Sequence, residues 1–373
     1  MLRRPVSGIA KIAVLTLAIT FFALGAYSEK PVAGSEYSVL PPLSNGNLTI
    51  FPVVAAHSHD TGGFLTLDEG VRSGQVVITE TSQASPLLRR PGMHPQSRGA
   101  EVNRLVLINN SERPLLLLAG EIVTGGKQDR VIGADRIVPP KSDPVDLSVF
   151  CVEPGRWVAR SENFSSMKGQ MAQPSVRLPA MAAKDQAEVW SRVRESNGAM
   201  AKAAPAASAA IGGTTSYASV MENKAVQDNI DKVAAPIQQD YQRLLKQLRQ
   251  KNATGVVVAI NGRIVWADLF ASPDLLEAYW PKLVRSYAAE AVTSPSGTKG
   301  VDEDRAIAFL AQLSGTREVV ETEPGVFRRA EISGDGFKVF NIVSLLPKTN
   351  FTVHLAKMAD AGSDPRPMPM MVR

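Results

Sequence analysis

The segment GVVVAINGRIVWAD, Gly255 to Asp268, decides how we interpret the fold of this chain. Two apolar runs rich in β-branched residues flank Asn261-Gly262, a dipeptide that in this setting predicts a type I′ turn between two antiparallel strands. An isolated hairpin is only marginally stable in water, and this one is apolar on both faces. We therefore expect the hairpin to pair with, or pack on, a sheet formed by the first half of the chain.

Short apolar and alternating runs fill that first half. Gly, Asn, Ser and Pro separate them, which is typical of antiparallel sheets and not of βαβ units. A short helix is expected from Thr66 to Gly74. The expected strands cover residues 48–54, 76–80, 104–109, 114–118, 131–138 and 145–152.

The second half alternates between helical and strand patterns. Spacings of three and four between apolar residues predict helices. Proline inside a helix costs about 3 kcal/mol, so two helices or a kink are expected at Pro236, and a break is expected at Pro281. The expected helices cover 184–195, 222–251 and 274–292, with a further capped helix beginning at Asp302. Three closing strands are expected at 326–332, 337–345 and 351–357.

These patterns predict an α+β fold with an antiparallel β-rich, sandwich-like core and helices packed on it. We expect one domain over 37–358: a β-rich part (37–160), a helical part (183–251) and a hairpin-helix-strand part (255–358). The Ala/Gly-rich stretch 199–213 is interpreted as a mobile connector or surface excursion. A disordered tail is expected at 359–373.

The N-terminus predicts export. Basic residues precede an apolar run from Ile12 to Ala23, and small residues follow it, so residues 1–26 resemble a signal peptide; the alternative is a retained N-terminal anchor. The protein is therefore expected to be periplasmic or secreted, with membrane contact only through this segment. Residues 1–30 carry three of the five net positive charges, so the remaining +2 gives no reason to expect nucleic acid as a partner.

Two dense polar clusters, residues 119–130 and 151–157, make the candidate site. The strands expected at 131–138 and 145–152 lie between them, so a β scaffold would carry two polar turns whose side chains could converge. The proposed anion-binding residues are Gly125, Gly126, Lys127, Gln128, Arg130, Arg156 and Trp157. Arginine suits an anion because its planar fork engages two oxygens, and glycine amides approach an anion closely. Glu121 and Glu153 would be the acid and base of a hydrolase.

A structural interpretation competes with this pocket. In it, Glu121 pairs with Arg130 or Lys127, and Glu153 pairs with Arg156, as clamps that brace two turns. Cys151 is expected to be a buried small residue. His57 and His59 are expected in an exposed polar loop, so no metal site is assigned, and no cofactor is implied.

The same residues resemble a known family. The string Gly120-Glu121, Gly125, Lys127-Gln128, Arg130, then Cys151-Val152-Glu153 and Gly155-Arg156-Trp157, is similar to the ARPP-1 family, the ADP-ribosylglycohydrolase- and rhodanese-phosphatase-associated protein domain. A second signature is Asn261-Gly262-Arg263-Ile264, Asp268-Leu269-Phe270 and Trp280-Pro281-Lys282-Leu283. The chain departs from the usual pattern at Gly126, Asp129 and Pro154. The resemblance covers roughly residues 37–358 and implies a link to ADP-ribose-derived or phosphorylated metabolites.

We therefore expect an exported ligand-binding or accessory protein of the ARPP-1 type whose partner is an anionic small molecule. One alternative is a hydrolase acting on a phosphorylated or ADP-ribose-like compound. A second alternative is a structural cell-envelope protein that acts through protein partners.

Overall fold

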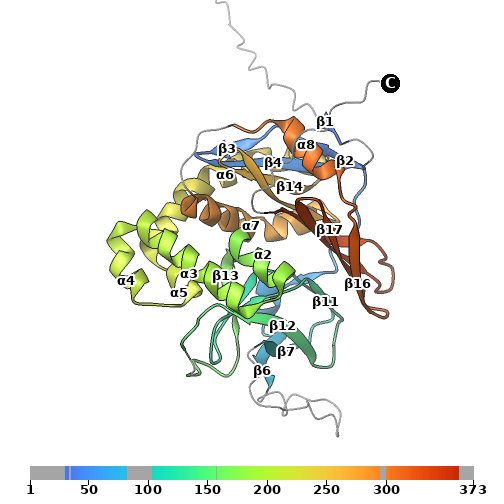
Figure 1. Cartoon of the computed structure of the whole chain (residues 1–373). Coiled ribbons are helices and arrows are strands. Elements are labelled where there is room, and N and C mark those ends of the chain that lie inside the picture. The colour runs from blue at the N-terminus through green and yellow to red at the C-terminus, as the bar shows by residue number, and fades with distance from the viewer. Residues whose placement is uncertain (1–29, 33–34, 82–102, 157, 295–299, 361–373) are drawn as a thin grey trace, which may run out of the picture.

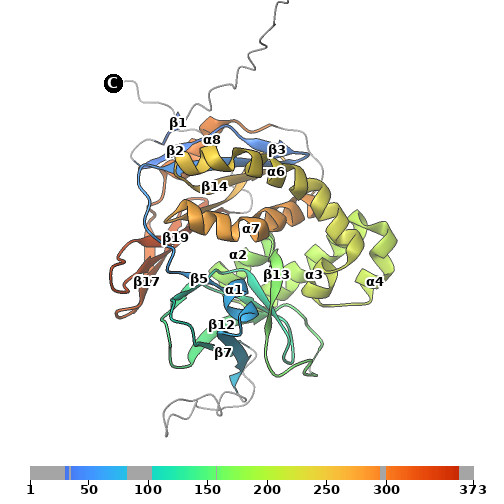
Figure 2. The same cartoon turned by 180° about the vertical axis from the view of Figure 1, so that it is seen from behind.

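The computed structural model describes residues 30–32, 35–81, 103–156, 158–294 and 300–360. A ten-stranded sheet occupies the upper part of the molecule in Figure 1, and sheets of six and three strands lie below it. Helices lie between these layers and to one side of them (Figures 1 and 2). No helix within the described ranges is long and apolar enough to cross a membrane.

The hairpin expected from the sequence lies inside the ten-stranded sheet. The strand order is β1-β2-β4-β14-β15-β19-β18-β17-β16, and β3 also pairs with β4. The bounds are β1 Lys30–Pro31, β2 Tyr37–Val39, β3 Leu43–Asn45, β4 Leu48–Ala55, β14 Ala253–Ile260, β15 Arg263–Phe270, β16 Arg317–Glu323, β17 Phe327–Gly334, β18 Phe337–Ser344 and β19 Thr352–Ala359. Because β14 pairs with β4, the predicted pairing of the hairpin with the first half is confirmed.

The turn of this hairpin has the predicted geometry. Asn261 and Gly262 both have positive φ, 53° and 73°, as a type I′ turn requires. Both faces of β14 are buried: Val256 and Val258 join the core that includes α7, while Val257 joins the core that includes α8. The helices are α6 Lys224–Gln250, α7 Pro273–Thr293 and α8 Glu303–Ala311. Burial on both faces explains why the hairpin sequence does not alternate with polar residues.

The two smaller sheets hold the candidate site. The six-stranded sheet has the order β13-β9-β10-β12-β7-β6, and the three-stranded sheet has the order β11-β8-β5. Their bounds are β5 Leu65–Thr66, β6 Val76–Glu80, β7 Arg104–Asn109, β8 Leu115–Leu117, β9 Glu121–Thr124, β10 Arg130–Ile132, β11 Arg136–Val138, β12 Val145–Cys151 and β13 Ser165–Met171. Apart from the parallel β5 and β8, strand pairs in the described chain are antiparallel, and the α+β class is confirmed.

Several local predictions differ from the structure. The run 131–138 is two strands in different sheets, because Gly133 to Asp135 redirect the chain between β10 and β11. The predicted connector 199–213 is largely helical, and its buried Ile211 anchors it to the main core. The remaining helices are α1 Leu67–Arg72, α2 Pro174–Leu178, α3 Gln186–Ala203, α4 Ser208–Gly212 and α5 Tyr217–Met221, with a π turn at Pro179–Ala183 and a 3₁₀ turn at Pro205–Ala207.

The predicted break at Pro281 is wrong, because Pro281 lies inside the continuous α7. Pro236 lies inside the continuous α6, so the chain forms one helix there and not two. Tertiary packing outweighs the lost backbone hydrogen bonds, since Ile237 and Trp280, beside these prolines, are buried in the main core. The predictions for residues 1–26, for Trp157 and for most of 359–373 concern parts of the chain outside the described residues.

Candidate functional site

The second polar cluster folds against the first through β10 and β12. Arg130 of β10 lies opposite Cys151 of β12, and this register brings Asp129 next to Glu153. The amide of Asp129 donates to Oε2 of Glu153 at 3.2 Å, and the amide of Val152 donates to the carbonyl of Asp129 at 3.1 Å. The prediction that the two clusters converge is therefore confirmed for these residues.

Arg156 connects the two turns. Its Nε donates to Glu153 at 2.7 Å, one Nη donates to Asp129 at 3.2 Å, and the other donates to the carbonyl of Gly126 at 2.8 Å. Arg160, half exposed, adds a contact of 3.5 Å to Glu153. The predicted clamp between Glu153 and Arg156 is confirmed, and it extends to Asp129, a residue that sequence reasoning had not assigned to the site.

The two carboxylates of this cluster differ in acidity. Burial and the neighbouring Glu153 raise the pKa of Asp129. Burial also opposes ionisation of Glu153, but hydrogen bonds from Arg156 and from the amide of Asp129 outweigh it and lower the pKa of Glu153. Two neighbouring carboxylates whose pKa values are shifted in opposite directions are able to share one proton.

The glycine turn is shaped by close packing. Gly125 and Gly126 have positive φ, and a Cβ on Gly126 would lie 2.3 Å from the ring of Phe164. The amide of Gly125 donates to Asp129 at 3.1 Å, and the amide of Lys127 donates to Glu80 at 3.1 Å. Carboxylates of the chain itself therefore occupy two of the amides that an anion would need.

The remaining predicted residues of this turn are buried to different degrees. Arg130 and Gln128 are buried, whereas the Lys127 side chain is partly exposed and contacts no charged partner among the described residues. Burial lowers the pKa of Arg130, against the raising effect of Cys151, Glu80 and Asp129. Arg130 is thus part of the interior beneath the turn.

Glu121 belongs to a different cluster. Its carboxylate accepts from Lys282 Nζ at 2.7 Å and from the amide of Leu118 at 2.8 Å, and Lys282 also contacts Asp68 at 2.8 Å. The expected pairing of Glu121 with Arg130 or Lys127 is therefore wrong. Glu121 and Glu153 have no partner in common, and both are buried. Burial raises the pKa of Glu121 despite the neighbouring Lys282.

A third ionic cluster lies in the interior, where the sheets and helices meet. Arg177 of α2 donates to both oxygens of Asp268, at 3.2 and 3.3 Å, and its guanidinium lies 4.3 Å from the ring centroid of Trp266. His354 of β19 contacts Asp135 at 2.6 Å and Asp268 at 3.2 Å. Sequence reasoning missed this cluster because its members lie far apart in the chain. Asp268 stands in the second family signature, but neither Arg177 nor His354 stands in a motif that would indicate it as the partner.

This cluster makes stability depend on pH. Burial lowers the pKa of His354, but Asp135 and Asp268 outweigh this effect and raise it to about 9. The unfolded value is about 6.5. The folded state therefore binds more protons between these values, so the contribution of His354 is complete below pH 6.5 and is lost as pH rises through 9.

Lys357 opposes this dependence. It lies between the rings of Phe309 and Phe337 and donates to the carbonyls of Phe309 and Gln312 at the end of α8. Burial lowers its pKa to about 7, below the unfolded value, so its contribution to stability rises with pH above 7.

We therefore expect the Lys357→Met variant to reveal the effect of His354. Its Tm should fall by about 5 °C between pH 6.5 and 9, because the lysine no longer compensates for the effect of His354. The Tm of the wild type, which keeps the lysine, should change less. Differential scanning calorimetry across this pH range measures both profiles. A variant whose Tm rises or stays constant over the same range would contradict the assignment of a buried imidazolium.

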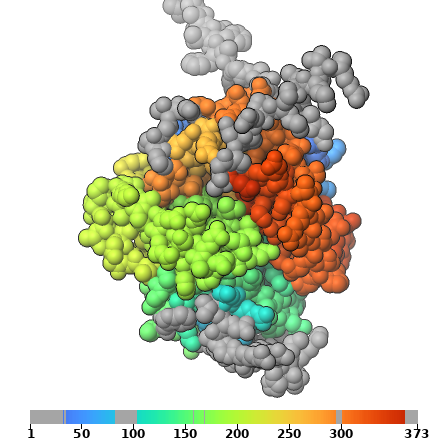
Figure 3. Space-filling view, in the orientation of Figure 1, coloured from blue at the N-terminus to red at the C-terminus, as the bar shows by residue number. Residues whose placement is uncertain are grey.

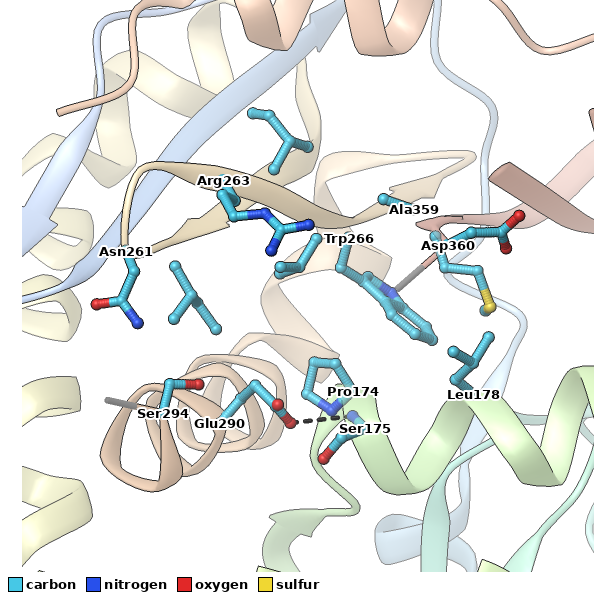
Figure 4. A pocket seen from close by; sticks show the side chains of 14 residues that line it. Pro174, Ser175, Leu178, Asn261, Arg263, Trp266, Glu290, Ser294, Ala359 and Asp360 are labelled. Atoms are coloured by element: carbon cyan, nitrogen blue, oxygen red, sulfur yellow. Dashed lines mark hydrogen bonds between the residues drawn. The ribbon is translucent and has the colours of Figure 1, made fainter. Parts of the chain in front are cut away.

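An open pocket of about 360 Å³ is lined in part by Trp266, the residue whose ring also contacts Arg177 (Figure 4). Its apolar wall includes Pro174 and Leu178 of α2. Arg263 of β15 and Glu290 of α7 point toward the same space from opposite sides. One oxygen of Glu290 accepts from the amide of Ser175 at 2.9 Å. Sequence reasoning noted Arg263 only as part of the second family signature.

The other sequence candidates carry no site in the structure. His57 and His59 are exposed as predicted, and His59 stacks on Phe351 with a centroid distance of 4.1 Å. The described residues contain no group of three or more His, Cys, Asp or Glu able to hold a metal ion. Cys151 is buried as predicted, and burial raises the pKa of its thiol.

Comparison with known proteins gives one finding. No curated protein and no solved structure matches the chain. A family model, the ARG and Rhodanese-Phosphatase-superfamily-associated Protein domain, matches residues 36–358, which include all three ionic clusters and the lining of the open pocket except Ala359 and Asp360. The chain therefore belongs to the ARPP-1 family.

Proposed function

We propose that this protein is an exported accessory protein that binds an anionic small molecule, and that the ligand is a phosphorylated ribose compound of the ADP-ribose type. The observation that carries the proposal is the open pocket between β15, α2 and α7. It combines an apolar wall with few polar groups, as ligand pockets do.

The polar groups of this pocket suit two different parts of such a ligand. The side chain of Arg263 is exposed and forms no ion pair or hydrogen bond with any described residue, so its fork is available for a phosphate or carboxylate. Glu290 is fixed through one oxygen by Ser175 and Gln173. Its other oxygen is left to accept hydrogen bonds from ligand hydroxyls, and ribose hydroxyls supply such donors.

The central clusters support the choice of the open pocket, because their cationic and amide donors already have partners within the chain. Arg156 is occupied by two carboxylates and by backbone carbonyls, and the amides of Gly125 and Lys127 are occupied by Asp129 and Glu80. An anion entering there would have to displace these bonds. At Arg263 it would displace no side-chain hydrogen bond or ion pair of the described residues.

The family description and the N-terminal sequence support the remaining parts of the proposal. The family is described by association with ARG and with the rhodanese-phosphatase superfamily, which suggests ligands with phosphate groups. Export is supported by the basic and apolar pattern of residues 1–26.

Thermal unfolding against a ligand panel tests the proposal. The panel contains ADP-ribose, ribose 5-phosphate, inorganic phosphate and a dicarboxylate. A ligand at about 100 times its Kd adds roughly 2.7 kcal/mol of stability. ADP-ribose or ribose 5-phosphate should raise the Tm. Arg263→Ala should keep the wild-type Tm without ligand and weaken binding by about tenfold to 100-fold, because it removes a charged hydrogen-bond donor.

Two further variants make the result specific. Arg194→Ala removes an exposed guanidinium of α3 that does not line the pocket, and this variant should bind as the wild type does. Arg156→Ala should melt early, yet still respond to the ligand. If the ligand response disappears in Arg156→Ala and persists in Arg263→Ala, the site is the central cluster. Turnover of a bound compound would instead identify a hydrolase, and no response to any compound would favour the structural envelope protein.

A further inference from the structure

Strand β16, Arg317–Glu323, forms one edge of the ten-stranded sheet. It pairs with β17 and with no other strand of the described chain. Six of its seven residues are exposed, and the seventh, Glu323, is partly buried. In Figure 1 the strand lies at the outer side of the molecule, and Figure 3 shows this orange-red arm forming part of the outer surface. One row of backbone N–H and C=O groups therefore faces solvent along the length of the strand.

The side chains of this edge protect it only in part. Natural edge strands are commonly blocked by charged side chains, above all lysine, and by proline. β16 contains neither lysine nor proline, and two of its acids, Glu321 and Glu323, already pair with Arg329 and Arg136 of the same chain. Instead, Val319 and Val320 are 46% and 50% exposed, and they are two of the three large hydrophobic residues that are exposed in the described chain. Adjacent exposed valines on an open edge favour the addition of another strand.

We infer that β16 pairs antiparallel with β16 of a second copy of this chain, about a two-fold axis at Val320. Val320 is the middle residue of the strand, so this axis uses all seven residues of both copies. It sets Val320 against Val320, and it sets Arg317 of each copy opposite Glu323 of the other. Opposite charges directly across an antiparallel pair are stabilising.

The charges of the free chain are consistent with this arrangement. The Arg317 side chain contacts no acid among the described residues, so the second copy would supply its first partner. Glu323 uses one oxygen for Arg136 at 2.7 Å, which holds the carboxylate in place and leaves the other oxygen for Arg317 of the second copy. The same sequence thus carries both halves of the ion pair, as an isologous two-fold contact requires.

Sedimentation equilibrium on the purified protein tests the inference. The measurement covers about 1 to 200 µM, a range that brackets the affinities of small interfaces. The wild type should form a dimer in this range. Val320→Lys and Val320→Glu should each weaken the dimer at least tenfold, because like charges would meet at the axis. An equimolar mixture of the two variants should recover the dimer, since lysine then faces glutamate.

The control variant is Val158→Lys. It changes the third exposed hydrophobic residue, which lies outside the sheet, and it should dimerise as the wild type does. Circular dichroism confirms that each variant is folded. The inference is overturned if the wild type stays monomeric over the whole range, if Val320→Lys dimerises like the wild type, or if the mixed variants remain monomers. A monomeric wild type would leave the edge to a strand of another protein.

Discussion

Arg177→Met is expected to lower the free energy of unfolding by about 3–5 kcal/mol, the cost of leaving one partner of a buried ion pair without its counter-charge. Arg177 and Asp268 are both fully buried, and the guanidinium engages both carboxylate oxygens. Arg177 and His354 are what keep the pKa of Asp268 below its ordinary value against burial. Methionine fills much of the space but provides no charge, so Asp268 is left with His354 and Tyr287.

Urea denaturation of matched variants measures this effect. Arg192→Met is the control, because Arg192 forms an exposed ion pair with Glu195 one helical turn away, and such pairs contribute about 0.3–0.5 kcal/mol. A loss below about 1 kcal/mol in Arg177→Met would contradict the assignment of an indispensable buried cation. Equal losses in the two variants would show that replacing arginine by methionine acts through the unfolded state and not through the buried cluster.

The position of Arg177 also explains one glycine of the first family signature. Gly120 has a φ of 94°, and a Cβ there would lie 2.5 Å from Cγ of Arg177. The backbone of Gly120 donates to Ile132 and accepts from Ala172. The signature glycine therefore allows the chain to pass against the buried arginine. The glycine of a motif that resembles a ligand loop is therefore required here for packing.

Local features of this fold could be predicted from the sequence, whereas its long-range clusters could not. The Asn261-Gly262 hairpin and the Thr66 cap of α1 depend on neighbouring residues, and both have the expected geometry. Asp135 and His354 meet across 219 positions of the chain, and neither stands in a local pattern. A pattern of apolar residues also cannot indicate β16, because Glu and Thr occupy most of that strand.

The same limit applies to the candidate site. The sequence correctly indicated that Glu153 pairs with Arg156, since these residues are three apart and lie in one turn. It did not indicate that Glu121 pairs with Lys282, because that contact joins β9 to α7 across 161 positions. Charge complementarity among neighbours is visible in a sequence. Which of several basic residues reaches a buried acid depends on the packing of distant elements.

Lys282→Met tests that long-range pair. We expect it to lower the free energy of unfolding by about 3–5 kcal/mol, because Glu121 is fully buried and Lys282 is its only cationic partner among the described residues. Asp68, the second carboxylate on Lys282, is partly exposed and can recover water. The penalty should therefore come chiefly from Glu121, and it should shrink at lower pH, where protonation removes the charge that the lysine neutralises.

A double-mutant cycle with Glu121→Gln isolates this contribution. If the charge of Glu121 causes the loss, Lys282→Met/Glu121→Gln should be more stable than Lys282→Met alone, with a coupling energy of about 2–3 kcal/mol from urea denaturation. Lys224→Met, at an exposed pair with Asp228, should change stability by less than about 0.5 kcal/mol. Additive losses in the cycle would mean that Lys282 acts through its packing against Tyr279 and not through its charge. Either result measures how much Glu121 contributes to the free energy of unfolding. A catalytic acid that faced solvent could be replaced without a loss of stability.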